Sequence, residues 1–338
     1  MTTLVHTTRL ALAVLAGLAA SPAIAQDAPA LTIYTYDGFA AEWGPGPQLA
    51  EGFEAQCGGC SVEFIAADSS IGALRRVQLE GATTAADLVV GLDVATAGEA
   101  RATGLFADHT LELGSLALPE PWTDPQFVPV DYAHFAFVYD TDRTATPPAS
   151  FEELIALPDD FKIVIQDPRS ATPGLGLVLW IKAAYGDRAP EIWAGLKPHI
   201  LAVTRDWSES YNLFLTGEAD MALSYTTSPA YHIVDEDDHT IKAALFNEGH
   251  TVQVEIAGML ASTDQPELAR QFLAYLASPA AQAIIPTTNW MFPVVDLGAD
   301  LNPAFDTLPQ PTKTLTISDT DLETNRAAWI DEMLAAIQ

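Results

Sequence analysis

Short β-rich runs alternate with segments of helical spacing along this chain, and that alternation limits the fold more than any other feature of the sequence. The β-rich runs are Leu31–Tyr36, Val62–Ala66, Leu88–Gly91, Ile163–Gln166, Leu201–Thr204 and Met221–Tyr225. Most are followed by segments with apolar residues three or four positions apart, such as Ile71–Glu80, Leu175–Tyr185 and Tyr211–Leu215. Strands that alternate with helices in this way predict an α/β fold with largely parallel sheets.

The β-rich runs fall into two sets, which are separated by Phe127–Asp140 with its own strand-like core at Phe135–Tyr139. Thr251–Leu260 is a further β-like run after the second set, and the helical segments Pro266–Leu276 and Asp319–Ile337 follow it. This order predicts two lobes joined by more than one crossing strand. We expect residues 26–131 to form the first part of lobe 1, 132–140 to cross over, 141–250 to form lobe 2, 251–260 to cross back, and 261–338 to return to lobe 1.

The N-terminal 25 residues have the pattern of a secretory signal peptide. Arg9 supplies positive charge, Leu10–Ala20 is a short apolar run, and Ala23-Ile24-Ala25 provides a small-x-small cleavage site. The apolar run is too short to span a bilayer. There is no lipid-accepting cysteine near the cleavage point, so we expect the exported protein to be free rather than lipid-anchored.

The charge of the chain excludes one class of partner. Lys and Arg number 15 against 45 Asp and Glu, for a net charge of −30, and removal of Arg9 with the signal peptide gives −31. A polyanion of this strength does not bind nucleic acid phosphates non-specifically.

Cys57 and Cys60 are the only cysteines of the chain and enclose Gly58-Gly59. A C-x-x-C pair in a cytosolic protein suggests redox chemistry or half a zinc site, but there is no second pair here. In an oxidising compartment we expect a local disulfide that closes a Gly-Gly turn.

Acids, hydroxyls and tryptophans follow the β-rich runs, where ligands bind in open α/β sheets. These residues are Asp37, Trp43, Asp68-Ser69-Ser70, Asp93, Asp167–Thr172, Asp206-Trp207 and Thr226-Thr227-Ser228. A cation with aromatic rings suits such a set, because carboxylates supply opposite charge and aromatic faces supply stacking and cation–π attraction.

Three of these loops have the pattern of a helix start. Thr172-Pro173 and Ser228-Pro229 place a hydroxyl that can cap a helix before a proline, and Ser69-Ser70 is suited to begin a third helix. Such starts leave backbone N–H groups free to receive a phosphate or another anion. Ordinary capping is the better explanation for any one of them, but three on the same predicted edge favour an anion site.

The usual catalytic signatures are absent from the sequence, and no metal site is predicted. His134 and His232 have no metal-ligand partner at a useful spacing. The acidic run Asp235–Asp238 is expected to form a solvated loop. Three tryptophans lie in apolar helical patterns and are expected in the core: Trp180, Trp193 and Trp329. Trp290 instead lies in a polar-aromatic turn, where ligand binding and packing are equally plausible.

Several long motifs in a fixed order resemble the periplasmic thiamine-binding proteins of bacterial ABC transporters. They are Tyr34–Asp37, Trp43–Pro47, Gln166–Arg169, Thr172–Gly176, Trp207–Glu209, Ser224–Tyr231 and Asn289–Met291. The resemblance runs from Leu31 to the final helix. It implies a type II periplasmic binding protein with two α/β lobes, each a mostly parallel sheet flanked by helices, and a ligand in the interlobe cleft.

The resemblance also implies which residues hold the ligand, namely Trp43, Thr172, Trp207, Tyr225, Thr226, Thr227, Ser228, Tyr231 and Trp290. The chain departs from the family at Ser69-Ser70, where an acid and glycine are common, and at Ala171, where serine is common. Both loops still offer backbone N–H groups. These changes affect the expected preference among thiamine and its phosphates.

Thiamine has a permanently charged thiazolium ring and a flat aminopyrimidine. We expect aromatic side chains to stack on the rings, Tyr36 to lie beside them, and Asp37 or Asp93 to offset the charge. Thr172, Tyr225, Thr226 and Ser228, together with Ser69-Ser70, are expected to hold the hydroxyethyl or phosphate end. We therefore expect a monomer that needs no cofactor and delivers thiamine to a membrane permease.

Two alternatives stay open at this point. A carrier of the same fold can bind another small solute, such as ferric iron, a polyamine or a phosphonate, although Tyr225 and Tyr231 are spaced unlike the adjacent tyrosines of iron carriers. The other alternative is an exported hydrolase of thiamine compounds that uses Asp37 or Asp167, because carboxylates in a cleft permit acid–base chemistry.

Overall fold

The computed structural model of the protein describes residues 28–338. The signal peptide predicted at residues 1–25 lies outside this range. Among the described residues, no helix combines the length and the apolar character that crossing a membrane requires.

The elements alternate in the two predicted sets. The first set is β1 (Ala30–Tyr36), α1 (Asp37–Ala40), α2 (Pro45–Glu54), β2 (Ser61–Ala67), α3 (Ser70–Glu80), β3 (Leu88–Asp93) and α4 (Val94–Ala102). The second set is α5 (Phe151–Ile155), β5 (Ile163–Gln166), α6 (Thr172–Tyr185), α7 (Ala189–Leu196), β6 (Ile200–Thr204), α8 (Trp207–Leu215), β7 (Met221–Tyr225) and α9 (Pro229–Asp235). Helices α6 and α8 begin earlier than predicted, because their first turns lack apolar periodicity.

The remaining elements connect or flank these sets. They are β4 (Phe127–Asp140), β8 (Ile241–Ala243), β9 (His250–Met259), α10 (Pro266–Leu276), α11 (Pro279–Gln282), α12 (Ile285–Thr288), β10 (Phe292–Pro293), β11 (Thr314–Leu315) and α13 (Asp319–Ile337). The strands pair into one mixed sheet with the main order β2-β1-β3-β9-β4-β7-β5-β6. Strand β1 is parallel to β2 and β3, and β5 is parallel to β6 and β7, whereas β9 and β4 run antiparallel to their neighbours in the middle.

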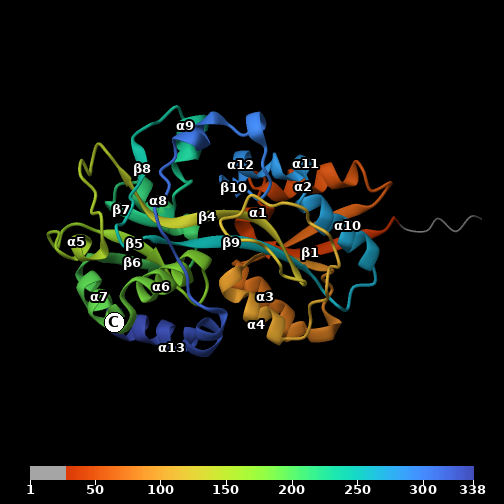
Figure 1. The fold of residues 1–338 in the computed structure, drawn as a ribbon, viewed down its shortest axis with the longest axis horizontal. Coiled ribbons are helices and arrows are strands. Elements are labelled where there is room, and N and C mark those ends of the chain that lie inside the picture. Colours follow the sequence, from red (N-terminus) through yellow and green to blue (C-terminus); the bar gives the residue numbers. More distant parts are fainter. Residues whose placement is uncertain (1–27) are drawn as a thin grey trace, which may run out of the picture.

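Strands β4 and β9 run side by side through the middle of the molecule (Figure 1). Residues 127–134 of β4 pair with β9, and residues 135–139 of the same strand pair with β7. Residues 255–259 of β9 also pair with β3. We call the part around β2-β1-β3 the first lobe and the part around β7-β5-β6 the second lobe. The residue limits of the two lobes remain a prediction.

Each lobe has an apolar core of its own. Phe53 and Phe272 pack edge to face at 5.1 Å in the first lobe. Trp180 and Trp193 are fully buried in the second lobe, as predicted, and Phe151 packs on Trp180. Separate cores allow two lobes to keep their shape while the strands between them bend.

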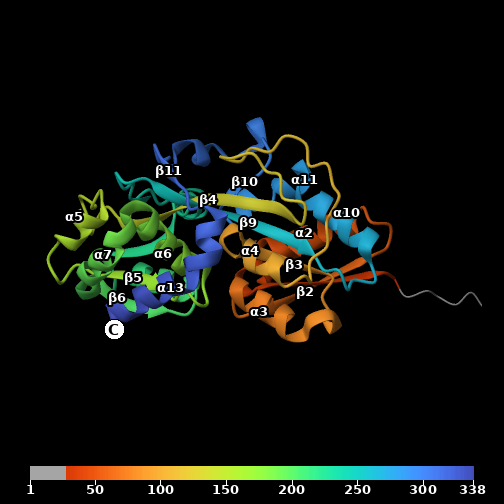
Figure 2. The ribbon, with the colours of Figure 1, turned by 60° about the horizontal axis from the view of Figure 1, so that its bottom comes forward.

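The C-terminal helix lies on the second lobe, which corrects the prediction that all of residues 261–338 return to the first lobe. Helix α10 does pack on β9 and α2, but α13 packs on α6 and α7 and also contacts α4 (Figure 2). Met333 of α13 is buried in the core of the second lobe, and Trp329 packs against it. Apolar contacts between α13 and the second lobe thus determine the position of this helix.

Cys57 and Cys60 form a disulfide after α2. Gly58 and Gly59 between them have φ angles of 77° and 110°, a region that glycine adopts readily and other residues do not. The two glycines therefore provide the tight turn that the disulfide closes.

Candidate ligand-binding site

Two hydroxyl groups join the lobes at the starts of α3 and α6. Ser70 Oγ and Thr172 Oγ1 lie 2.6 Å apart, and both side chains are buried. Ser69 caps α3 by accepting a hydrogen bond from the Gly72 N–H. Ala171 is the buried N-cap residue of α6 and has no side-chain acceptor. The two loops predicted to receive a phosphate therefore lie side by side.

The prediction that the Thr172 and Ser228 hydroxyls cap helices is wrong, because both hydroxyls have other partners. Thr172 lies inside the first turn of α6 and contacts Ser70. Ser228 is the N-cap residue of α9 but makes no side-chain cap bond. Its Oγ lies 2.7 Å from Ser224 Oγ and accepts a hydrogen bond from the Tyr225 N–H.

Trp207 is fixed to the segment that follows β7. Its indole Nε1 donates to Ser224 Oγ at 2.8 Å, and its ring stacks on Tyr211 at 4.6 Å. Thr226 and Thr227 are fully buried in this segment, and Thr227 Oγ1 contacts Met291 Sδ at 3.7 Å. These two threonines therefore hold the loop in place, while Trp207 is only half-buried.

The other aromatic candidates have the features of a binding surface. Trp43 is 60% exposed, which is unusual for so large an apolar side chain. Tyr231 and Trp290 pack edge to face at 5.5 Å. Trp290 has a φ of 55°, a left-handed conformation that is strained for a bulky residue and clusters at functional sites.

Tyr36 and Tyr225 each donate a hydrogen bond to β9. The Tyr36 hydroxyl donates to Glu255 Oε2 at 3.0 Å and lies 3.4 Å from Asn289 Oδ1, and the Tyr225 hydroxyl donates to Gln253 Oε1 at 2.7 Å. Burial raises the pKa of both phenols well above the ordinary value, and nearby carboxylates raise it further. Both tyrosines are therefore neutral hydrogen-bond donors.

The structure separates the two acids expected to offset a positive charge. Asp37 is exposed and makes no side-chain hydrogen bond to any of the residues that the structure describes. Asp93 is buried and caps α4 by accepting from the Ala95 N–H at 2.7 Å. Burial raises the pKa of Asp93 to about 7.

Three residues beside the candidate site were missed as site residues. Asp131 and Glu255 are buried acids on β4 and β9, and Asn289 donates to Asp131 Oδ2 at 2.6 Å. Burial raises the pKa of Asp131 to about 7 and that of Glu255 well above its ordinary value. A single acid inside each of two long apolar strands was the available signal, because buried acids need a compensating partner.

His232 has neighbours that the sequence spacing did not indicate. Among the described residues, His232, Glu236 and Asp238 form a group whose ligand atoms lie within 4.8 Å of one another. Both ring nitrogens of His232 are already engaged, since Nδ1 lies 2.6 Å from Glu236 Oε2 and Nε2 lies 2.9 Å from the Tyr211 hydroxyl. This histidine therefore supports Tyr211 and, through it, Trp207. The other histidine considered in the sequence, His134, contacts Thr314 Oγ1 at 2.9 Å.

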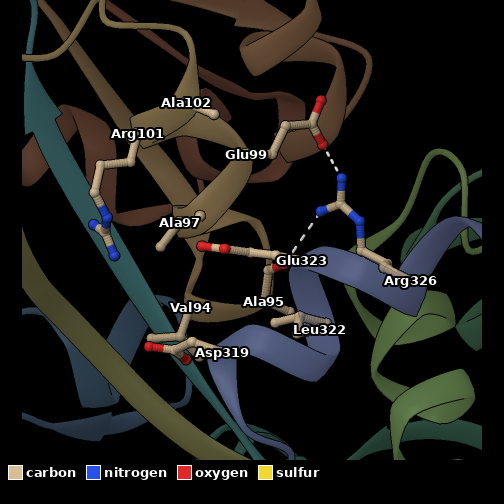
Figure 3. A pocket seen from close by; sticks show the side chains of 11 residues that line it. Val94, Ala95, Ala97, Glu99, Arg101, Ala102, Asp319, Leu322, Glu323 and Arg326 are labelled. Atoms are coloured by element: carbon tan, nitrogen blue, oxygen red, sulfur yellow. Dashed lines mark hydrogen bonds and ion pairs between the residues drawn. The ribbon is translucent and has the colours of Figure 1, made fainter.

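A pocket of about 500 Å³ lies between α4 and α13 (Figure 3). Glu99 and Arg101 line it from α4, and Asp319 and Glu323 line it from α13. Arg326 of α13 donates to the Ala95 carbonyl at 3.1 Å and pairs with Glu99. The pocket is thus spanned by an ion pair between the two lobes.

Comparisons with known proteins place the chain in a family. The profile of the family described as bacterial extracellular solute-binding protein matches residues 37–283. The thiamine-binding periplasmic protein of Brucella melitensis is 47% identical over 312 residues, covering 92% of this chain and 93% of that protein. The protein of the same name from Escherichia coli is 45% identical, covering 91% and 94%.

A solved structure of a periplasmic thiamin binding protein is also similar. It superposes with a TM-score of 0.89 at 45% sequence identity, covering 92% of this chain and 97% of that one. The chain therefore belongs to the bacterial extracellular solute-binding protein family and, within it, to the group of the periplasmic thiamine-binding proteins.

Proposed function

We propose that this protein captures thiamine between its two lobes in the periplasm and delivers it to the membrane permease of an ABC importer. The observation that carries the proposal is 45–47% identity, over more than nine-tenths of the chain, to relatives named as thiamine-binding periplasmic proteins. The residues of the candidate site also suit thiamine chemically.

Aromatic side chains of both lobes are suited to the two flat rings of thiamine. Trp43 comes from the first lobe and Trp207 from the second, while Tyr231 and Trp290 form an edge-to-face pair. Stacking and cation–π attraction favour a flat, positively charged ring between such side chains. The four rings are the proposed walls of the site.

The paired starts of α3 and α6 are suited to the hydroxyethyl or phosphate end. Ser69, Ser70 and Thr172 lie together there, and helix starts present free N–H groups to an anion. We therefore propose that thiamine mono- and diphosphate bind as well as thiamine.

The remaining parts of the proposal follow from the role of a carrier. The protein binds without catalysis, cofactor or metal, and a monomer suffices because both walls of the site come from one chain. Closure of the lobes around the ligand is a hinge transition of known type. Residues 1–25 are the proposed export signal.

Calorimetric titration of ligand-stripped mature protein with thiamine, its mono- and diphosphate and spermidine tests the function. We expect submicromolar binding of thiamine at one site and no heat with spermidine. Absence of binding by every thiamine form would refute the proposal. Release of product from thiamine phosphates would show a hydrolase instead, and a coloured complex after iron loading would show an iron carrier.

Substitution of the exposed tryptophan tests the aromatic walls. Trp43→Ala should weaken thiamine binding at least about tenfold, because a stacked aromatic contributes roughly 1–3 kcal/mol. Leu79→Ala is the matched control, since Leu79 is 88% exposed on α3 and is not a candidate residue. Trp207→Ala and Tyr225→Ala should weaken binding as strongly. Unchanged affinity would remove that residue from the site.

A further inference from the structure

Three carboxyl groups lie side by side across the middle of the sheet. Asp93 on β3 is the register partner of Glu255 on β9, and Glu255 is in turn the register partner of Asp131 on β4. Directly opposed residues of antiparallel strands project to the same face with Cβ atoms about 5 Å apart. We call these three residues the carboxylate row.

The carboxylate row is buried and incompletely hydrogen-bonded. Asp93, Glu255 and Asp131 are 3%, 2% and 0% exposed. One oxygen of each has a partner: Asp93 Oδ1 accepts from Ala95, Glu255 Oε2 from Tyr36 and Asp131 Oδ2 from Asn289. Asp93 Oδ2, Glu255 Oε1 and Asp131 Oδ1 are buried and have no hydrogen-bond partner within residues 28–338. A buried carboxylate in this state is stable only if it takes up a proton or meets a positive charge.

The groups around the row do not supply that charge. Tyr36 faces it from β1, Tyr225 from β7, and Asn289 from the turn after α12, and none of these side chains is positive. Arg326 of α13 acts on Asp93 and lowers its pKa, but it is already paired with Glu99 and bonded to the Ala95 carbonyl (Figure 3). Burial therefore leaves the pKa of Asp93 at about 7, and burial together with repulsion from Asp93 leaves the pKa of Asp131 at about 7.

The row lies directly behind candidate ligand residues. Tyr36 bonds Glu255, and Trp290 follows Asn289, which bonds Asp131. Tyr225 donates to Gln253, two residues before Glu255 on β9. Tyr36 reaches β9 because Gly91 of β3 has no side chain: a Cβ there would lie 2.5 Å from the Tyr36 ring. Three candidate ligand residues are thus coupled to the row.

We propose that the carboxylate row recognises the positive charge of the ligand by exchanging a proton for it. The inference rests on the proposed function and adds the chemical feature that the site selects. In the free protein the row holds protons. When the thiazolium ring binds against the tyrosines, a row carboxyl group ionises, its proton passes to solvent, and the carboxylate stays behind to balance the cation. A neutral ring of the same shape gains nothing from this exchange.

Proton-linked calorimetry tests the exchange in the mature wild-type protein. Thiamine is titrated at pH 6, 7 and 8 in buffers of different ionisation enthalpy, beside an analogue whose thiazolium nitrogen is replaced by carbon so that the ring is neutral. We expect release of about half to one proton per thiamine at pH 7, and affinity about tenfold lower at pH 6 than at pH 8. The neutral analogue should release no proton and bind at least about tenfold more weakly.

Conservative variants assign the effect to the row. Glu255→Gln and Asp131→Asn should reduce proton release and the preference for the charged ring. Asp87→Asn is the matched control, because Asp87 is a buried acid of the first lobe that bonds Thr32 and Thr263 outside the row. Thiamine binding without proton release, or equal affinity for the neutral analogue, overturns the inference and leaves the function standing. No thiamine binding at any pH overturns both.

Discussion

Single side chains around the candidate site are held in states that folding alone does not favour. Trp290 has a left-handed backbone conformation, Trp43 exposes most of its surface, and the row of Asp93, Glu255 and Asp131 buries three acids. Each state reduces stability by itself, and such departures are typical of functional positions. They lie on different elements that the sheet brings together.

The carboxylate row makes stability depend on pH in a defined direction. Because the pKa values of its members are raised on folding, the folded chain binds more protons than the unfolded chain between about pH 4 and pH 7, and the free energy of unfolding falls as pH rises through this window. Glu255→Gln removes one titrating group. At pH 8 it should raise the Tm by about 2–4 °C, and at pH 4.5 it should change the Tm little.

Scanning calorimetry of ligand-free protein at both pH values measures this difference. Asp87→Asn, outside the row, should shift the Tm equally at the two pH values. An equal shift for Glu255→Gln would contradict the raised pKa of the row.

Helices α3 and α6 contact each other at their first turns. Ser70 lies in the first turn of α3 and Thr172 in that of α6, and their hydroxyls meet in a buried place. Removal of one partner leaves the other buried hydroxyl unsatisfied, which costs about 1–3 kcal/mol. The contact therefore couples two elements that are far apart in the sequence.

A double-mutant cycle on thiamine affinity measures that coupling. Thr172→Val and Ser70→Ala should each weaken thiamine binding. The double variant should bind thiamine about fivefold more tightly than the product of the two single losses predicts, because the second change removes a group that is already unpaired. The control pair is Thr172→Val with Ser150→Ala, since Ser150 caps α5 and does not contact Thr172. Additive losses in the first pair would show that the hydroxyls act separately.

The whole molecule is tied together although its cores are separate. Strand β4 pairs with β7 of the second lobe and with β9, which in turn pairs with β3 of the first lobe. Helix α13 packs on the second lobe while Arg326 bonds α4 of the first. Unfolding of one lobe would remove the partners of these shared elements. We therefore expect both lobes to unfold in one cooperative transition.

Core variants in each lobe test this cooperativity. Phe53→Ala in the first lobe and Trp193→Ala in the second should each reduce the free energy of unfolding by about 3–5 kcal/mol. Each should also lower the Tm of the same calorimetric transition. Thiamine should raise that transition in both variants, because it binds only the folded chain. Two resolved transitions, of which only one moves in each variant, would show that the lobes unfold independently.

Local features of the sequence predicted the fold class, most strand and helix positions and many candidate residues, because strand and helix periodicity is encoded by near neighbours. Family motifs likewise pointed to Trp207, Tyr225 and Trp290. Two other results depended on long-range packing. The Thr172 hydroxyl contacts Ser70 of the first lobe rather than its own helix end, and α13 docks on the second lobe.

The carboxylate row shows most clearly what only the tertiary structure decides. Asp93, Asp131 and Glu255 are scattered along the sequence, and each alone is one acid at or inside a strand. Their adjacency comes from the pairing of β3, β9 and β4, and the pKa of each is raised mainly by burial within the folded sheet. Register between distant strands is set by the packing of the whole sheet, so no local pattern in the sequence records it.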